Sequence, residues 1–237
     1  MTYLNVFLFA VFPYLALVVL LVISILRYVR QGFTYSSLSS QFLENRYHFW
    51  GSVPFHYGII VVLLGHLVAF LMPRQILWWN STSLRLYILE VSALICGLLA
   101  LVGLVNLVLR RLTHARARVT TSAADWIVFG LLMFSIATGV YIAIAYKWGS
   151  SWFAASLSPY LWSIVTFSPR IEYVIGLPVV VQLHILAAFT LLLLFPFTRL
   201  VHILVVPIPY LWRRPQVVRW YWNRRLIRNA LTGPPSP

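Results

Sequence analysis

Five uninterrupted apolar runs constrain this chain more than any other feature. They cover residues 4–26, 53–72, 86–109, 124–146 and 177–206. Each run has the roughly 20 residues that a helix needs to cross a hydrocarbon core about 30 Å thick. Hydrophobic residues make up 61% of the 237 residues and charged residues only 9%, which is far more apolar than a soluble domain of this size. Because lipid offers no partner for backbone polar groups, every run must be helical. The predicted fold is therefore an all-α membrane protein, a bundle of five transmembrane helices.

Basic residues between the runs predict the orientation of this bundle. Loops 27–52 and 110–123, together with the tail, carry 13 arginines, whereas the opposite side carries only Arg74, Arg85, Lys147 and Arg170. Basic loops stay on the cytoplasmic side. We therefore expect a multi-pass protein of the cytoplasmic (inner) membrane with its N-terminus outside and its C-terminus in the cytoplasm. Residues 1–212 would form the transmembrane domain and residues 213–237 a basic cytoplasmic tail.

The net charge of +14 does not indicate a nucleic-acid partner, because the arginines lie at the ends of apolar runs or in the tail. Such positions suit anionic lipids or a docked protein. The single cysteine, Cys96, excludes a disulfide within the chain and an iron–sulfur or structural zinc site built by this chain alone. The aromatic segment 151–167 is expected to lie along the outer membrane surface as an amphipathic element.

Four histidines fall inside the apolar runs, His56 and His66 in the second and His184 and His202 in the fifth. An ionisable side chain in hydrocarbon is costly and usually functional. The two runs are antiparallel, so His56 and His202 both lie toward the cytoplasm, while His66 and His184 both lie toward the outside. Two imidazoles at one level can ligate a six-coordinate b-type haem. We therefore predict two haem b groups, with these histidines as axial iron ligands.

Other uses of these histidines stay open from the residues alone. Proton relays and hydrogen bonds between helices are the main alternatives, while zinc would need a more compact tetrahedral cluster. The spacing is also unequal: ten residues rise about 15 Å and eighteen residues about 27 Å along an ideal helix. Pro196 could kink the fifth helix and reduce the mismatch. In a straight helix, eighteen residues make five turns, so His184 and His202 would share a face.

Several segments resemble one family closely. They read "SSQFLENR" (39–46), "FHYGIIVVLLGH" (55–66), "RRLTHARARVTTSAAD" (110–125) and "LLLLFPFTRLVHILVVPIPYL" (191–211). The chain resembles the gamma subunits of respiratory nitrate reductase, five-helix dihaem cytochromes b. The resemblance implies that the family's four haem ligands have counterparts in all four intramembrane histidines, with the inner haem on His56 and His202 and the outer haem on His66 and His184.

The same resemblance implies a function. The subunit would oxidise quinol from the membrane quinone pool near the outer face and pass electrons through two b haems to the cytoplasmic side. There an iron–sulfur beta subunit and a molybdenum-containing alpha subunit would reduce nitrate, and this chain would hold no nitrate site. The alternatives are a related dihaem subunit of a nitrite-oxidising, heterodisulfide or sulfite system, or a haem-free histidine-bearing transporter.

Charged residues suggest where quinol would react. Arg85 and Glu90 lie at the outer end of the third run, where Glu90 could accept a quinol proton and Arg85 could steady the developing oxygen charge. Alternatively, Arg85 extends to the interface, and Glu90 pairs with Arg85 or reaches water. Asp125 is expected to be a charge at a helix N-terminus. Arg111 and Arg199 are candidate partners for haem propionates or anionic lipid.

Overall fold

A computed structural model describes residues 3–35 and 46–205 of the chain. Within these residues every regular element is helical, and five helical segments are long and apolar enough to cross a membrane. This confirms the predicted five-span, all-α membrane protein. The predicted tail, residues 213–237, and its boundary at residue 212 lie outside the described residues. The five membrane-spanning segments are Tyr3–Thr34, His48–Leu71, Ser83–Thr113, Ala123–Ala145 and Val179–Phe197.

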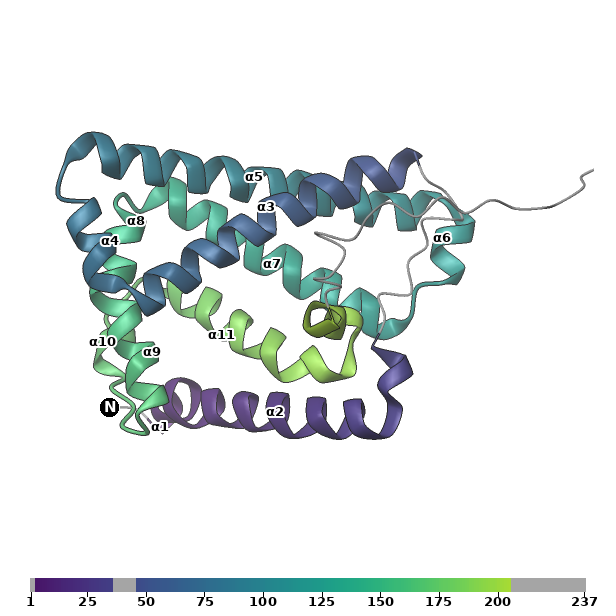
Figure 1. The fold of residues 1–237 in the computed structure, drawn as a ribbon, viewed down its shortest axis with the longest axis horizontal. Coiled ribbons are helices and arrows are strands. Elements are labelled where there is room, and N and C mark those ends of the chain that lie inside the picture. Colours follow the sequence, from purple (N-terminus) through teal and green to yellow (C-terminus); the bar gives the residue numbers. More distant parts are fainter. Residues whose placement is uncertain (1–2, 36–45, 206–237) are drawn as a thin grey trace, which may run out of the picture. The chain divides into compact units, whose positions relative to one another are not determined.

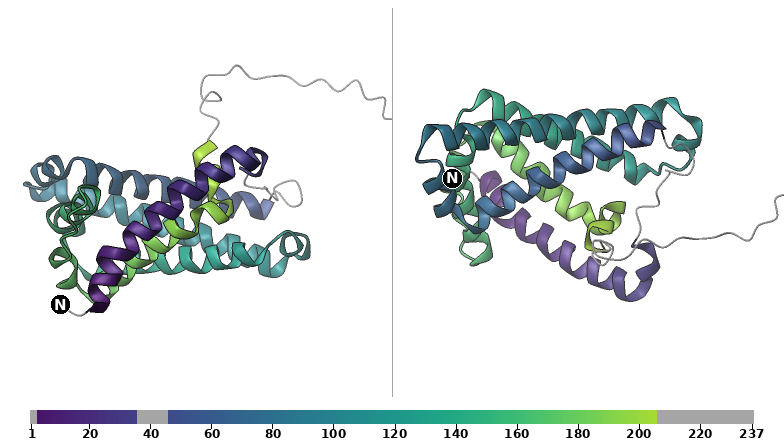
Figure 2. Two further views of the ribbon diagram at one scale, coloured as in Figure 1. Left: turned by 90° about the horizontal axis from the view of Figure 1, so that it is seen from below. Right: turned by 45° about the horizontal axis from the view of Figure 1, so that its top comes forward.

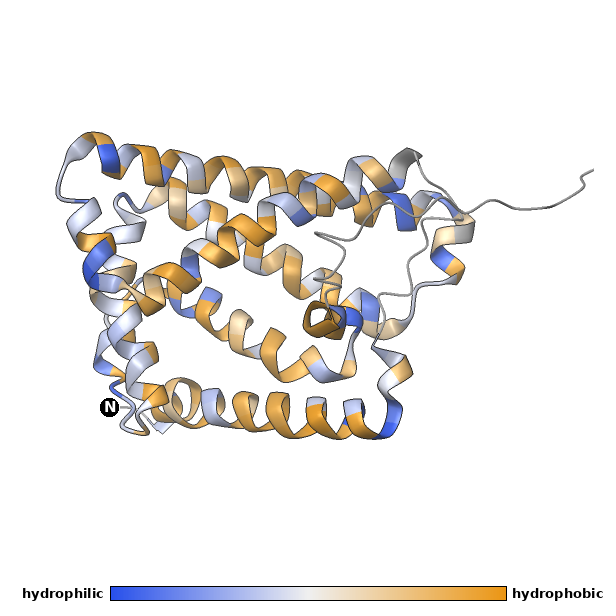
Figure 3. Ribbon diagram, viewed as in Figure 1, coloured by the Kyte–Doolittle hydropathy of each residue, from blue (hydrophilic) through white to orange (hydrophobic). Residues whose placement is uncertain are grey.

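The long helices lie side by side in an order that differs from their order in the chain (Figures 1 and 2). Helix α3 packs along α5, α5 packs along α7, α7 packs along α11, and α11 packs along α2. Apolar residues cover most of their length, while hydrophilic residues gather toward the two ends (Figure 3). The helices are α2 (Phe12–Gln31), α3 (Arg46–Leu71), α5 (Ser83–Thr113), α7 (Ala123–Ala145) and α11 (Val179–Leu194).

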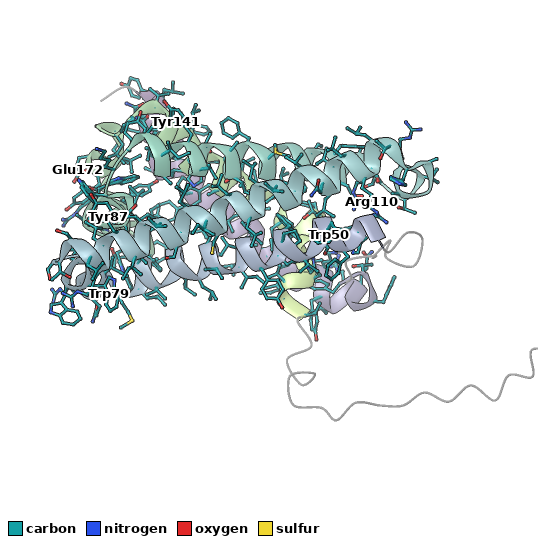
Figure 4. All side chains as sticks on the ribbon, turned by 90° about the horizontal axis from the view of Figure 1, so that it is seen from above. Trp50, Trp79, Tyr87, Arg110, Tyr141 and Glu172 are labelled. Carbon is teal, nitrogen blue, oxygen red and sulfur yellow. The ribbon has the colours of Figure 1, made fainter. Side chains whose placement is uncertain are left out.

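Short helices close one end of the bundle, which we name the α9 end. The opposite end, where α6 (Ala115–Val119) lies, is named the α6 end (Figure 1). Figure 4 shows Trp79 and Tyr87 at the α9 end and Arg110 at the α6 end. The elements of the α9 end are α4 (Pro73–Trp79), α8 (Gly149–Trp152), the π-helical turn η4 (Phe153–Leu157), α9 (Ser158–Val165) and α10 (Glu172–Ile175).

The segment that we expected along the outer membrane surface lies across one end of the bundle and packs against it (Figure 1). Ser158 and Tyr160 are fully buried. The Ser158 hydroxyl donates to the Ala69 carbonyl at 2.8 Å, and the Trp162 indole donates to the Phe70 carbonyl at 2.9 Å. Both carbonyls belong to the last turn of α3, where carbonyl groups have no hydrogen-bond donor within their own helix. The segment 151–167 therefore caps the end of α3.

Two prolines inside helices each leave a backbone carbonyl without its usual N–H donor, and a side chain of another helix donates a hydrogen bond to it. Pro13 has no N–H for the carbonyl of Phe9, four residues earlier, and the chain forms a π-helical turn, η1 (Phe7–Val11), at this point. The Tyr160 hydroxyl donates to the Phe9 carbonyl at 2.8 Å. Burial raises the pKa of Tyr160 above its ordinary value, so the phenol stays a neutral donor. In the same way, Pro54 frees the Trp50 carbonyl within α3, which accepts from the Asn106 amide at 3.4 Å.

Glycines bring the backbones of α3 and α5 into direct contact. A Cβ on Gly58 would lie 2.5 Å from the Cys96 carbonyl oxygen and 2.6 Å from the Ala100 nitrogen. A Cβ on Gly103 would overlap the backbone nitrogen of Phe55. Small residues permit such close helix contacts in membranes. This contact fixes the rotation of α3 about its axis, and with it the face that carries the two histidines of α3.

The fifth run is not one helix, so our expectation of a continuous helix over residues 177–206 was wrong. Helix α11 ends at Leu194 and is followed by a 3-10 turn, η5 (Phe195–Phe197). Thr198 is extended, and a second 3-10 segment, η6 (Arg199–Val205), runs in a different direction from α11 (Figure 1). Pro196 lies at the break, where its ring cannot continue the hydrogen-bond pattern of α11. Neither the eighteen-residue rise nor the shared face of His184 and His202 therefore applies.

Candidate functional site

Two histidines from distant parts of the chain face each other toward the α6 end. His56 comes from α3 and His202 from η6, and their ring centroids are 6.3 Å apart with the planes at 65°. A metal bound by one nitrogen of each ring at about 2.0–2.1 Å would place the two centroids roughly 6 Å apart. The observed separation therefore leaves room for a single metal ion between the rings.

The other two histidines lie nearer the α9 end. His66 is in the second half of α3, with its ring 5.3 Å from that of Phe153 in η4. His184 is in the first half of α11, the helix that follows α10 of the α9 end. The structure thus places His56 beside His202, and it places His66 and His184 in the half of the bundle nearer the α9 end.

All four rings are hydrogen-bonded through the same nitrogen. Because a carbonyl oxygen only accepts, Nδ1 must carry the proton wherever it meets one. The fourth ring, that of His184, meets the Thr138 hydroxyl, which also contacts the carbonyls of Phe134 at 2.8 Å and Ser135 at 3.0 Å. When the hydroxyl donates to one of these carbonyls, it accepts from Nδ1 of His184. The Nδ1 partners are the carbonyls of Ser52 for His56 (2.7 Å), Val62 for His66 (2.8 Å) and Arg199 for His202 (2.6 Å), and the Thr138 hydroxyl for His184 (3.0 Å).

This pattern leaves Nε2 of each ring as an unprotonated nitrogen, with no hydrogen bond to it from any described residue. Histidines that ligate metals commonly donate their other ring N–H to a carbonyl or similar acceptor, which fixes the tautomer and the ring orientation. The four rings are therefore prepared for coordination. Across residues 3–35 and 46–205, no three His, Cys, Asp or Glu side chains gather into a metal site, whereas a haem iron needs only two axial ligands.

The neighbours of His184 were not expected from the sequence. A Cβ on Gly139 of α7 would lie 3.1 Å from the Cε1 atom of His184, so the absence of a side chain there lets the imidazole lie against the α7 backbone. Thr138, the adjacent residue, supplies the hydrogen-bond acceptor. A Thr-Gly pair in mid-span is the only sequence signal for this support, and it is a weak one.

An arginine at the α6 end has unsatisfied donors. The Nε and Nη1 atoms of Arg111 are buried without a hydrogen-bond partner in the described part of the chain, and its guanidinium lies 4.8 Å from the centre of the Phe129 ring. It is near enough to Asp125 and Arg199 to interact with their charges. Buried donors without partners are costly, so this arrangement suits an anionic group such as a carboxylate.

The two other charged residues of this region hold η6 against α7. Arg199 donates to the Thr120 carbonyl at 2.8 Å and pairs with Asp125 at 3.1 Å. Asp125 also accepts from the Ser122 backbone at 2.8 Å, while the Ser122 hydroxyl accepts from the Asp125 backbone. This capping box confirms the interpretation of Asp125 as a charge at a helix N-terminus. The ion pair to Arg199 is a second use that the sequence did not indicate.

Arg85 and Glu90 both lie toward the α9 end, but the structure does not bring them together. Glu90 accepts from the Ser150 amide at 2.8 Å and from its hydroxyl at 2.5 Å. Arg85 donates to Thr82 at 2.6 Å and lies 4.8 Å from the centre of the Trp78 ring. The interpretation that these two residues form an ion pair is therefore wrong.

The sequence of this chain is similar to those of one protein family. The model of the family named nitrate reductase gamma subunit matches residues 5–221. The respiratory nitrate reductase 2 gamma chain of Escherichia coli K12 is 36% identical over 222 residues, which are 92% of this chain and 97% of that protein. The nitrate reductase gamma chain of Bacillus subtilis 168 is 31% identical over 90% of this chain and 96% of its own length. The nitrate reductase-like protein NarX of Mycobacterium tuberculosis H37Rv is 30% identical, with 86% of this chain matching 32% of that protein. The chain belongs to the nitrate reductase gamma subunit family.

Proposed function

We propose that this chain is the membrane-anchoring, dihaem cytochrome b subunit of a quinol-dependent nitrate reductase. As a gamma chain it is an electron-transfer subunit of an oxidoreductase complex. The observation that carries the finer proposal is the common state of its four intramembrane histidines. Each has Nδ1 hydrogen-bonded and Nε2 available, and they lie in two pairs at two levels of the bundle.

Four residues would hold the two cofactors. His56 and His202 would be the axial ligands of an inner haem b, and His66 and His184 those of an outer haem b. When bound, such haems carry single electrons across the membrane. Around them, the hydrogen bonds to Nδ1 hold each ring in place, and the unpartnered donors of Arg111 suit a haem propionate at the α6 end.

Quinol would be oxidised at the α9 end. The outer haem proposed on His66 and His184 is the one nearer this end, so quinol that reacts here would pass its electrons to that haem first. Arg85 and Glu90 are the charged residues of α5 at this end, and they remain the residues to test. In this proposal Glu90 is a proton acceptor already hydrogen-bonded to Ser150, and Arg85 is a cation held among the tryptophans of α4.

The orientation and the partners follow from the distribution of charge. The α6 end carries Arg110 and Arg111, and further arginines follow in the tail, so we place this end in the cytoplasm. An iron–sulfur beta subunit and a molybdenum-containing alpha subunit would dock there, where the inner haem is nearest. Anionic lipids would meet the remaining arginines. The proposed location is the cytoplasmic (inner) membrane.

Replacing each ligand in turn tests the proposal. His66→Ala and His184→Ala should each remove the outer haem and keep the inner one, while His56→Ala and His202→Ala should do the reverse. Redox-resolved optical and EPR spectra of the purified complexes distinguish the two haems. His114→Ala, a histidine outside both proposed pairs, is the control and should retain both haems. A colourless wild-type protein, or loss of the same haem from His66→Ala and His202→Ala, contradicts the proposal.

A further inference from the structure

The break after α11 leaves backbone carbonyls that one arginine from another helix takes up. Arg27 lies near the end of α2, and its Nη1 atom donates to the carbonyls of Pro196 at 2.6 Å and Thr198 at 3.1 Å. Pro196 is fully buried and Thr198 is 7% exposed. Both carbonyls belong to the irregular stretch between α11 and η6, where the helical hydrogen-bond pattern is interrupted.

The same guanidinium is held from its other side. Its Nε atom donates to the Thr34 hydroxyl at 2.9 Å and its Nη2 atom to the Thr34 carbonyl at 3.0 Å. The Tyr35 ring centre lies 5.6 Å from its central carbon. A planar guanidinium with donors engaged on two sides has a defined position and orientation. Arg27 is therefore a rigid connection between the end of α2 and the break after α11.

A few hydrogen bonds connect the carbonyls that Arg27 contacts to His202. The Thr198 hydroxyl accepts from the Leu200 amide at 3.3 Å, and Nδ1 of His202 donates to the Arg199 carbonyl at 2.6 Å. The opposite side of η6 is held by the Arg199–Asp125 ion pair. The short segment that carries His202 is thus fixed at its beginning from two helices, α2 and α7.

We propose that Arg27 is a positioning residue for His202, and that it sets the orientation of this imidazole relative to His56. The inference rests on the proposed function, since it concerns a ligand of the inner haem. It predicts that loss of Arg27 changes the inner haem alone, because His184 lies twelve residues before Pro196. The Nδ1 partners of His66 and His184, on Val62 and Thr138, do not bond to Arg27.

Two substitutions and one control test this role in the complete complex. Arg27→Gln removes the guanidinium and its charge. Arg27→Lys keeps the charge, but a single ammonium group cannot donate to Pro196, Thr198 and Thr34 together. Arg30→Gln removes an exposed positive charge three residues further along α2. The measurements are the highest g value of each low-spin haem in EPR spectra, which reports the angle between its two imidazoles, and the midpoint potential of each haem.

The expected result is a shift of the g value and of the potential of the inner haem in both Arg27 variants, with the outer haem unchanged and Arg30→Gln like wild type. If Arg27→Gln does not assemble, Arg27→Lys alone decides the question. Unchanged inner-haem spectra, equal shifts of both haems, or the same shift in Arg30→Gln would overturn the inference. A wild-type protein without haem would instead overturn the proposed function, so the two failures can be told apart.

Discussion

Thr138→Val isolates one hydrogen bond to a proposed haem ligand. Valine keeps the shape of threonine but removes the acceptor that lies 3.0 Å from Nδ1 of His184. The ring cannot move toward α7 to compensate, because its Cε1 atom already lies where a Cβ on Gly139 would be in close contact. The substitution therefore removes a hydrogen bond that orients the His184 ring, and it does not open a cavity.

The size of the effect follows from what remains around the ring. Removing such a partner of a metal ligand typically lowers metal affinity about 10- to 100-fold. The Ser135 carbonyl is a second acceptor near His184, so the N–H is not left entirely unsatisfied. We therefore expect the lower end of this range, roughly a tenfold loss of affinity for the outer haem, which corresponds to about 1.4 kcal/mol of binding free energy.

Haem transfer from the purified complex to an excess of apomyoglobin, followed optically, measures this loss. The outer haem should leave Thr138→Val about tenfold more readily than wild type, an estimate taken from the typical effect of such partners, while the inner haem stays. Thr190→Val is the matched control, because the Thr190 hydroxyl bonds only to the Leu186 carbonyl of its own helix. Equal retention of the outer haem in Thr138→Val and wild type would refute the reasoning, as would selective loss of the inner haem.

Three further predictions concern packing, topology and quinol oxidation. Gly58→Val should lower the free energy of unfolding by more than the roughly 1–3 kcal/mol typical of overpacking, because even a Cβ would lie 2.5 Å from a backbone oxygen. Thermal unfolding in detergent measures this change. Gly130→Ala is the control and should have no such effect, because Gly130 has open space around it. A cysteine introduced at an exposed position of residues 147–170, such as Phe167, should react with an impermeant reagent from outside the cell. Outside labelling of the tail contradicts the proposed orientation. Arg85→Ala should slow haem reduction by quinol while both haem spectra persist and artificial donors still work; normal quinol turnover in both Arg85→Ala and Glu90→Gln would place the substrate elsewhere.

The spans and the approach of His56 to His202 could be predicted because both depend on patterns along the chain. An apolar run of sufficient length has no stable alternative to a helix in lipid, and alternating helix directions determine which histidines share a level. The separation along the helices could not be predicted. Pro196 indicated a kink, but the chain instead ends α11 at Leu194 and starts η6 in a new direction.

Supporting contacts escaped prediction because they join elements far apart in the sequence. Nothing near Arg27 indicates that it will hold the carbonyls of Pro196 and Thr198. The alternative interpretation, that Glu90 pairs with Arg85, was wrong for a simpler reason. Five residues turn a helix through about 140° beyond a full turn, so the two side chains leave α5 on different sides. Each then finds partners in the short helices of the α9 end.

The hydrogen bonds to the four Nδ1 atoms have a thermodynamic consequence. Each ring is oriented by contacts within the protein alone, so its rotational freedom is lost during folding and not when a cofactor enters. Immobilising a side chain on binding costs about 0.5–1.5 kcal/mol, or roughly 1–3 kcal/mol for the two ligands of one haem. Preorganised rings avoid this entropic cost, so in the proposed function part of the free energy of haem binding would be supplied when the chain folds.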